Sequence, residues 1–221
     1  MNHIAKPESA TQARVLRLFE DELGYKYLGD WSERPGNSNI ETDLLTAYLS
    51  EAGYTPAQIS AALYQLNKEA SHPDRTLYGN NQAVYGLLRY GVQVKTEAGK
   101  PMATVRLINW EQPEKNHFAV AQEVTLKKGD ALERRPDVVL YVNGIAMGVL
   151  ELKNSRVSIG DGVRQNLSNQ QPQFNQWFFS TVQLILAGND SEGLQYGTTG
   201  TEAKYFLTWK EDEADNSGYK L

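Results

Sequence analysis

Apolar residues in the first third of the chain recur at helical spacing. Residues 8–23 hold the clearest repeat, and a glycine follows them as a stop signal. A second helix is expected over 40–52, capped by Asn39, and a third over 55–70, where a threonine precedes a proline. Residues 29–39 are rich in turn-forming residues and are predicted to be a loop.

The hydrophobic period changes after residue 75. Short alternating or wholly apolar runs predict strands at 90–96, 103–108, 117–126, 182–188 and 204–209. Residues 158–168 return to helical spacing. This order predicts an α/β or α+β fold, with one mixed central β-sheet flanked by helices. We expect residues 1–75 to form a helical segment packed on a core at 76–210, with 211–221 as an acidic linker or tail.

Residues 138–153 carry the strongest local pattern in the chain. Two apolar runs flank Asn143-Gly144, a dipeptide typical of β-hairpin turns. Both runs are apolar on both strand faces. The hairpin is therefore predicted at the centre of the sheet, covered on both sides.

Composition and charge limit the chemistry. The 221 residues are 40% hydrophobic and 22% charged, as in a soluble globular domain. The absence of cysteine excludes disulfides, thiolate metal sites and cysteine nucleophiles, and three histidines argue against a polyhistidine metal site. A net charge of −5 argues against a protein that coats nucleic acid, although residues 126–165 are mildly basic. With neither a bilayer-length apolar run nor a signal-peptide pattern, we expect a cytoplasmic location without membrane contact.

Three charged residues stand at the ends of the predicted hairpin strands. Asp137 precedes the first strand, and Glu151 and Lys153 end the second. Charged groups at the ends of buried strands are costly unless they are paired or bind a metal. Two carboxylates with a lysine suit a hard divalent cation such as Mg²⁺, which binds phosphate oxygens and lowers the pKa of a bound water. Alternatively, Asp137 ends a turn and Glu151 and Lys153 form a solvated ion pair.

The metal-site hypothesis depends on the register of the hairpin. A strict two-residue turn at Asn143-Gly144 would place the carboxylates on opposite faces of the sheet. A three-residue loop that pairs Tyr141 with Ile145, or an equivalent bulged pairing, would put Asp137 and Glu151 on one face. Either solution predicts a positive φ at Gly144.

A longer set of segments carries a family resemblance. Pro136-Asp137, a hairpin and Glu151-x-Lys153 match the PD-(D/E)xK nuclease pattern. The supporting segments are Asn39-Ile40-Glu41, YGNNQAVYGLLRYGVQV at 78–94, NHFAVAQEVTL at 116–126, RRPDVVLYVNGIAMGVLELKN at 134–154, Tyr196-Gly197 and YFLTWKED at 205–212. Together they resemble the N-terminal nuclease region of type I restriction enzyme R subunits, over roughly residues 35–212.

The resemblance implies roles for individual residues. The catalytic set is Asp137, Glu151 and Lys153, and the metal ligands are the two carboxylates and the Leu152 main-chain carbonyl. The family's glutamine on the following helix matches Gln165, but Asn169 stands where its tyrosine would be.

Two further assignments have less support. Glu41 is a weaker candidate for the early-helix acid that many of these nucleases use as a metal ligand. Arg164 is expected at the surface or at a DNA phosphate.

The resemblance also implies a context. It predicts a restriction-endonuclease-like core that uses Mg²⁺ to cleave double-stranded DNA, with methyltransferase and specificity subunits as partners. The chain lacks a phosphate-loop motif, so ATP binding is expected only in a motor region after this segment. Two alternatives stay open, a degenerate nuclease fold that docks DNA or a subunit, and a free-standing resolvase or repair nuclease.

Overall fold

The computed structural model describes residues 8–95, 101–129 and 132–210, so the predicted tail at 211–221 lies outside the described residues. Seven strands form one mixed sheet in the order β1-β4-β5-β6-β7-β8-β9. The strands are β1 (Lys26–Asp30), β4 (Phe118–Gln122), β5 (Val138–Val142), β6 (Ile145–Lys153), β7 (Leu184–Asn189), β8 (Gly193–Gly197) and β9 (Leu207–Thr208). The β1–β4 and β6–β7 pairs are parallel, and the other neighbours are antiparallel. The predicted mixed sheet with flanking helices is confirmed.

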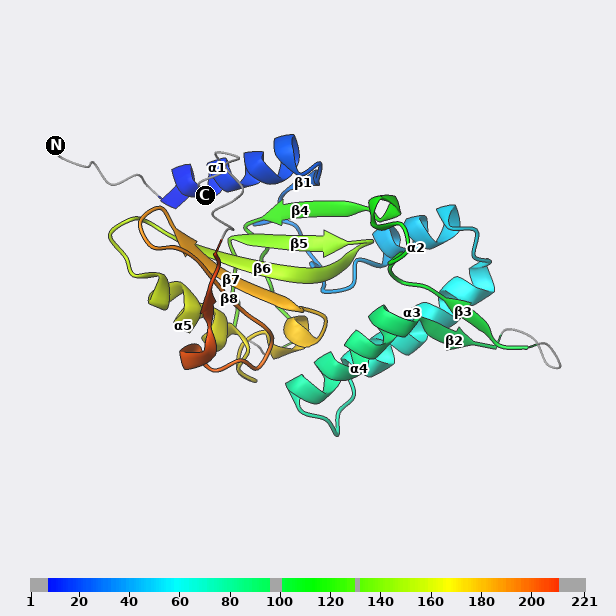
Figure 1. The fold of residues 1–221 in the computed structure, drawn as a ribbon. Coiled ribbons are helices and arrows are strands. Elements are labelled where there is room, and N and C mark those ends of the chain that lie inside the picture. The colour runs from blue at the N-terminus through cyan, green and yellow to red at the C-terminus, as the bar shows by residue number, and fades with distance from the viewer. Residues whose placement is uncertain (1–7, 96–100, 130–131, 211–221) are drawn as a thin grey trace.

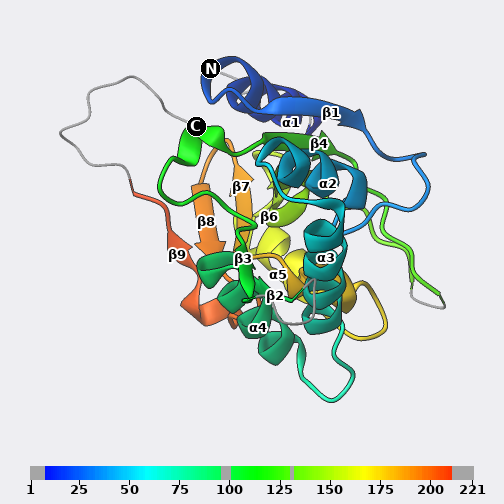
Figure 2. The same ribbon diagram turned by 90° about the vertical axis from the view of Figure 1, so that its right-hand side faces the viewer.

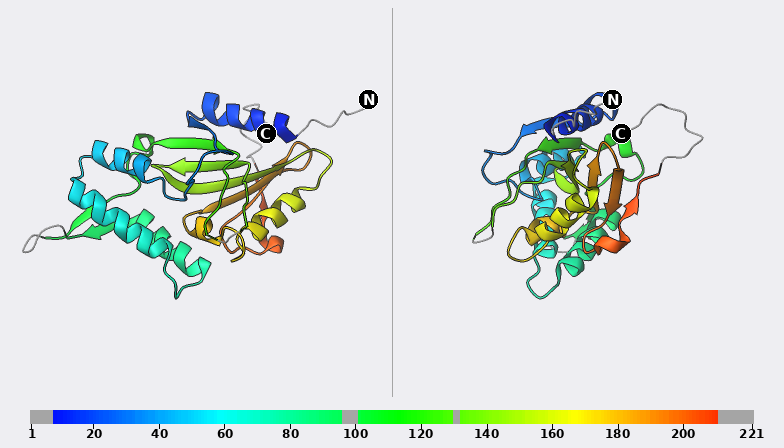
Figure 3. Two further views of the ribbon diagram at one scale, coloured as in Figure 1. Left: turned by 180° about the vertical axis from the view of Figure 1, so that it is seen from behind. Right: turned by 90° about the vertical axis from the view of Figure 1, so that its left-hand side faces the viewer.

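The β5–β6 hairpin occupies the centre of the sheet, as its apolar pattern predicts (Figure 1). Its strands are almost wholly buried because helices cover both faces. Helix α1 (Glu8–Arg17), continued by a π-helical turn at Leu18–Glu22, packs on the face that carries Leu150 and Leu152. Helix α5 (Ile159–Asn169) lies against the other side of the sheet, as views from front and back both show (Figures 1 and 3).

A second hydrophobic cluster forms beside the turn of the hairpin. Helices α2 (Thr42–Glu51), α3 (Pro56–Ala70) and α4 (Leu77–Tyr90) pack there with the small sheet of β2 (Val92–Val94) and β3 (Ala103–Val105) (Figure 2). The cluster runs without interruption across residue 75, where the sequence predicted a boundary. The division into domains itself stays a prediction.

Several elements differ from the expectation. β1 lies partly inside the predicted loop at 29–39, and α4 and β8 were not predicted. Helix α2 begins at Thr42 instead of residue 40, and Asn39 does not cap it. The Asn39 amide donates instead to the Trp177 carbonyl and the Ser180 hydroxyl, which ties this loop to a distant segment.

The third predicted helix is confirmed in detail. Thr55 and Gln58 form a reciprocal capping box at the start of α3, with a proline in its first turn.

Among the described helices, none has the length and apolar character needed to cross a bilayer.

Candidate active site

The register of the hairpin follows from a tight turn and a bulge together. Val142 pairs with Ile145, so Asn143 and Gly144 form a two-residue turn with φ of 53° and 82°. Positive φ at both turn residues is typical of a type I′ turn. Further along, Tyr141 pairs with Ala146 but Leu140 pairs with Gly148, which leaves Met147 as a bulge.

Of the two expected solutions, the structure has the bulged pairing and not the three-residue loop. Tyr141 does not pair with Ile145, but Val138 pairs with Leu150, and the register extended by one residue places Asp137 opposite Glu151. Because side chains alternate along a strand, both carboxylates lie on the face that α5 covers. The positive φ predicted at Gly144 is confirmed.

Asp137 contacts the main chain of β6 directly. The Leu152 N–H donates to Asp137 Oδ2 at 2.6 Å. The N–H and C=O of one strand residue point to the same side of the strand, so the Leu152 carbonyl faces the β5 side where Asp137 lies. This geometry places two carboxylates and one main-chain carbonyl at the open end of the hairpin.

Glu151 is fully buried and surrounded by polar side chains from its own strand and from α5. The Gln165 amide donates to Glu151 Oε2 at 2.8 Å, and the Asn169 amide contacts Glu151 Oε1 at 3.4 Å. The Lys153 ammonium lies 3.9 Å from Glu151 Oε2. The structure therefore brings Asp137, Glu151, Lys153 and Gln165 together.

Burial makes both carboxylates reluctant to ionise. Desolvation raises the pKa of Asp137 to about 6, although the Leu152 N–H and Lys153 act in the opposite direction. Desolvation, with the nearby Asp137 charge as the next cause, raises the pKa of Glu151 well above its usual value. Raised carboxylate pKa values of this kind are typical of functional sites, where burial is tolerated for the sake of chemistry.

Helix α1 adds two residues that sequence reasoning missed. Glu8 Oε1 lies 3.7 Å from the Lys153 ammonium. The Gln12 amide donates to the Asp137 carbonyl at 3.2 Å and to the Glu123 carboxylate at 3.0 Å. The spacing of α1 predicts a helix, but the place where that helix crosses the sheet depends on tertiary packing that a local pattern does not encode.

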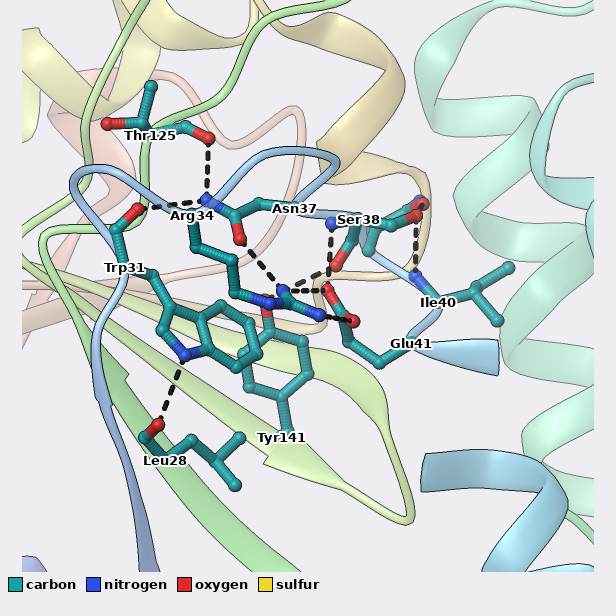
Figure 4. A network of polar contacts seen from close by, with 10 residues as sticks. Leu28, Trp31, Arg34, Asn37, Ser38, Ile40, Glu41, Thr125 and Tyr141 are labelled. Carbon is teal, nitrogen blue, oxygen red and sulfur yellow. Dashed lines mark hydrogen bonds and ion pairs between the residues drawn. The ribbon is translucent and has the colours of Figure 1, made fainter. Parts of the chain in front are cut away.

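The structure does not bring Glu41 to this site. Figure 4 shows the Glu41 carboxylate facing the Arg34 guanidinium, with nitrogen–oxygen distances of 3.0 and 2.7 Å. The Ser38 N–H donates to the same carboxylate at 2.9 Å. The Glu41 N–H donates to the Gly144 carbonyl at the turn, so this residue lies at the opposite end of the hairpin from Asp137. The hypothesis of Glu41 as a metal ligand is corrected, because a local ion pair occupies its oxygens.

Arg164 lies apart from the buried carboxylates. Its guanidinium pairs with Asp161 on the same helix, and its side chain is 67% exposed. This position is that of a surface residue, as one of the two expectations for Arg164 requires.

The donor set fits a hard divalent cation. Within the described residues, no group of three or more histidine or acidic side chains converges on one point. Two carboxylates and a main-chain carbonyl suffice for Mg²⁺, which usually keeps several water ligands. The Asp137 charge is the second cause, after burial, that raises the pKa of Glu151, and a cation between the two carboxylates would offset this repulsion.

The seven-stranded mixed sheet flanked by helices is compatible with a restriction-endonuclease-like fold. Residues 5–204 match the family described as the N terminus of the type I restriction enzyme R protein, and the chain belongs to this family.

Two curated relatives align with the chain. A Methanocaldococcus jannaschii protein, assigned as the endonuclease subunit of type I restriction enzyme MjaIXP, is 27% identical over 92% of the chain and 20% of the relative. The endonuclease subunit of type I restriction enzyme HindI from Haemophilus influenzae is 26% identical over 75% of the chain and 16% of the relative. The chain thus spans about a fifth or less of each relative's length.

Proposed function

We propose that this region is the Mg²⁺-dependent endonuclease domain of a type I restriction enzyme R subunit. Its reaction is the hydrolysis of DNA phosphodiester bonds within an ATP-driven restriction complex. The observation that carries the proposal is the pairing of Asp137 and Glu151 across the hairpin, with Lys153 on the same face. The names of the two relatives as endonuclease subunits give separate support.

Each group has a distinct task in this proposal. Asp137, Glu151 and the Leu152 carbonyl would hold Mg²⁺, and the bound ion supplies Lewis-acid activation of a phosphate and of the attacking water. Lys153 is 13% exposed, so its ammonium can reach solvent and an anionic substrate while its stem stays packed. Its positive charge would stabilise the negative charge that develops on the phosphate.

The proposal includes partners beyond this chain. The substrate is double-stranded DNA, and the methyltransferase and specificity subunits would deliver recognition. A motor region that binds ATP would bring DNA to the site. These assignments rest on the family and on the names of two relatives that are several times longer than this chain. The cytoplasm is the compartment where such a complex would act.

One competing function is a degenerate nuclease fold that only docks DNA or another subunit. A docking module has no need for two facing buried carboxylates, whose repulsion lowers the stability of the fold. The intact set of Asp137, Glu151 and Lys153 therefore favours catalysis over docking.

Substitution in a complete R subunit tests the proposal. Asp137→Ala, Glu151→Ala and Lys153→Ala, each assembled with the partner subunits, should abolish DNA cleavage and leave ATP-driven translocation intact. Asp161→Ala is the matched control, because this acid lies on neighbouring α5 but is exposed and paired with Arg164. Cleavage at the wild-type rate by Glu151→Ala would refute the site assignment.

A further inference from the structure

Two amides on α5 contact the two carboxylate oxygens of Glu151. Gln165 and Asn169 are four residues apart, so their side chains lie on the same face of the helix. The Gln165 amide contacts Oε2 at 2.8 Å, and the Asn169 amide contacts Oε1 at 3.4 Å. Each oxygen of the carboxylate therefore has its own N–H donor.

The orientation of Asn169 has a cost for folding. Asn169 is 1% exposed, and its Oδ1 has no hydrogen-bond partner among the described residues. Turning the amide over would direct Oδ1 at a carboxylate oxygen and remove the donor. A buried carbonyl without a partner destabilises a protein, so an apolar residue of similar size would suit the fold better.

The backbone of α5 holds these amides close to the strand. A Cβ atom at Gly162 would lie 3.2 Å from Ala187 Cβ and 3.7 Å from Glu151 Cβ. The missing side chain permits the helix to approach β6 and β7 closely at the level of Glu151. Asn169 is thus anchored on a packed helix, and its amide has little freedom to leave the carboxylate.

We infer that Asn169 is a positioning residue that, with Gln165, fixes the Glu151 carboxylate in the orientation that faces Asp137. This inference rests on the proposed function, because Asn169 has a positioning role only if Glu151 is a metal ligand. Each of the two neutral donors takes one lone pair of a carboxylate oxygen, so the other lone pairs stay available to a cation. The family resemblance leads us to expect a tyrosine here, and in this chain an amide supplies the second donor.

Metal binding measured on this chain tests the inference without measuring cleavage. Mn²⁺ is the probe, since it takes the same oxygen ligands as Mg²⁺ and its binding can be followed by electron paramagnetic resonance. Asn169→Leu keeps the approximate volume, removes the donor and also removes the unpartnered carbonyl. We expect a Kd for Mn²⁺ raised roughly 10- to 100-fold, the usual cost of losing a group that orients a metal ligand.

Asn166→Leu is the matched control. Asn166 is also buried on α5 and also has an unpartnered Oδ1, but its amide donates to the Leu186 carbonyl at 2.9 Å instead of contacting Glu151. This variant should lower the melting temperature and leave the Kd for Mn²⁺ within about threefold of the wild type, a change well below the usual cost of losing an orienting group. Should Asn169→Leu fail to fold, Asn169→Ala answers the same question with a smaller side chain.

The outcomes separate the inference from the proposed function. If Glu151→Gln abolishes Mn²⁺ binding while Asn169→Leu binds with the wild-type Kd, the positioning role is wrong and the metal site stands. If Glu151→Gln leaves Mn²⁺ binding unchanged, the metal site is wrong and the inference is overturned with it. A raised Kd in Asn169→Leu, with no such change in Asn166→Leu, supports the inference.

Discussion

The two ends of the β5–β6 hairpin both bury polar groups, but they balance them in opposite ways. At the turn, both polar atoms of the buried Asn143 side chain have hydrogen-bond partners. At the open end, two facing carboxylates lie beside one lysine, and burial raises the pKa of both acids. The contrast teaches that burial of a polar residue does not by itself mark a functional site, whereas an unbalanced set of buried charges does.

The turn end shows what a satisfied buried network does. Asn143 is fully buried, and its Oδ1 accepts from the His117 N–H at 2.7 Å. Its amide donates at 2.8 Å both to the Leu107 carbonyl and to Asn116 Oδ1. Nearby, Arg34 and the Ser38 N–H satisfy the Glu41 carboxylate. These bonds join loops distant in the sequence and leave no charge without a partner, which is a structural task.

The largest expected effect comes from making the same substitution, glutamate to glutamine, at each end of the hairpin and comparing the two variants. In a complete R subunit, Glu151→Gln should slow DNA cleavage on the order of 1000-fold, because losing a metal anchor removes several kcal/mol of transition-state stabilisation. Glu41→Gln should leave the cleavage rate of folded protein unchanged and reduce stability by about 1–3 kcal/mol, through loss of a charge-assisted pair. Single-turnover cleavage and urea unfolding measure the two quantities. Equal losses of cleavage in both variants would end the distinction.

The turn end can be disrupted through its glycine. A Cβ at Gly144 would lie 2.7 Å from Leu44 Cβ and 2.8 Å from the Leu45 nitrogen, in addition to its φ of +82°. Gly144→Ala should therefore cost about 2–4 kcal/mol of unfolding free energy. Gly53→Ala isolates the effect of φ, because Gly53 has a φ of +87° and no atom within 4 Å of the added Cβ; it should cost about 1 kcal/mol. Equal costs in urea unfolding would show that the packing around the turn yields readily.

The hairpin and its charged residues could be predicted from the sequence because they depend on local patterns. Two apolar runs around Asn143-Gly144 define the strands, and the sequence places Asp137 and Glu151 at their ends. The requirement that both carboxylates share a face predicted either a three-residue loop or a bulged pairing, and the structure has a bulge, at Met147, a position that the sequence did not specify. A bulge depends on how neighbouring side chains pack, which alternation alone does not encode.

The remaining features depend on contacts between distant segments. β1 pairs in parallel with β4, some ninety residues later, so its short sequence with a glycine gave little local signal. Glu41 directly precedes helix α2, close to where an early-helix acid is expected, yet its carboxylate pairs with Arg34, seven residues earlier. Glu8 reaches Lys153 only because α1 crosses the sheet at the open end of the hairpin. No spacing rule within the first 41 residues distinguishes these two acids.

The open end predicts an unusual dependence of stability on pH. Folding raises the pKa of Asp137 from 3.8 to about 6, so the folded chain holds a proton that the unfolded chain has released. The unfolding free energy of the metal-free protein should therefore fall as pH rises from about 4 to 6, by on the order of 2 kcal/mol. Asp137→Asn removes this contribution, so the variant should be more stable than the wild type at pH 8 and similar at pH 4.

Mg²⁺ provides the control for this pH effect. At pH 8 it should stabilise the wild type, because it binds the ionised site of the folded state, and it should stabilise Asp137→Asn much less. Urea unfolding of the wild type and of Asp137→Asn at pH 4 and pH 8, each with and without Mg²⁺, compares the two proteins under all four conditions. A wild type whose difference from Asp137→Asn does not change with pH would show that folding leaves the pKa of Asp137 unchanged.

The smallest expected effect belongs to a charged pair that is neither buried nor unbalanced. Arg164 and Asp161 lie on α5 near the open end, but both are exposed and paired with each other. Arg164→Ala should change the unfolding free energy by less than about 0.5 kcal/mol. If Arg164 contacts a DNA phosphate, the slope of log K against log salt for DNA binding by the R subunit should become shallower by about 0.9, with no preference for sequence. Binding titrations at several salt concentrations measure this slope. A large loss of stability or of cleavage at saturating DNA would place Arg164 in the site itself, and balance of charge would then be a poor guide to function in this sheet.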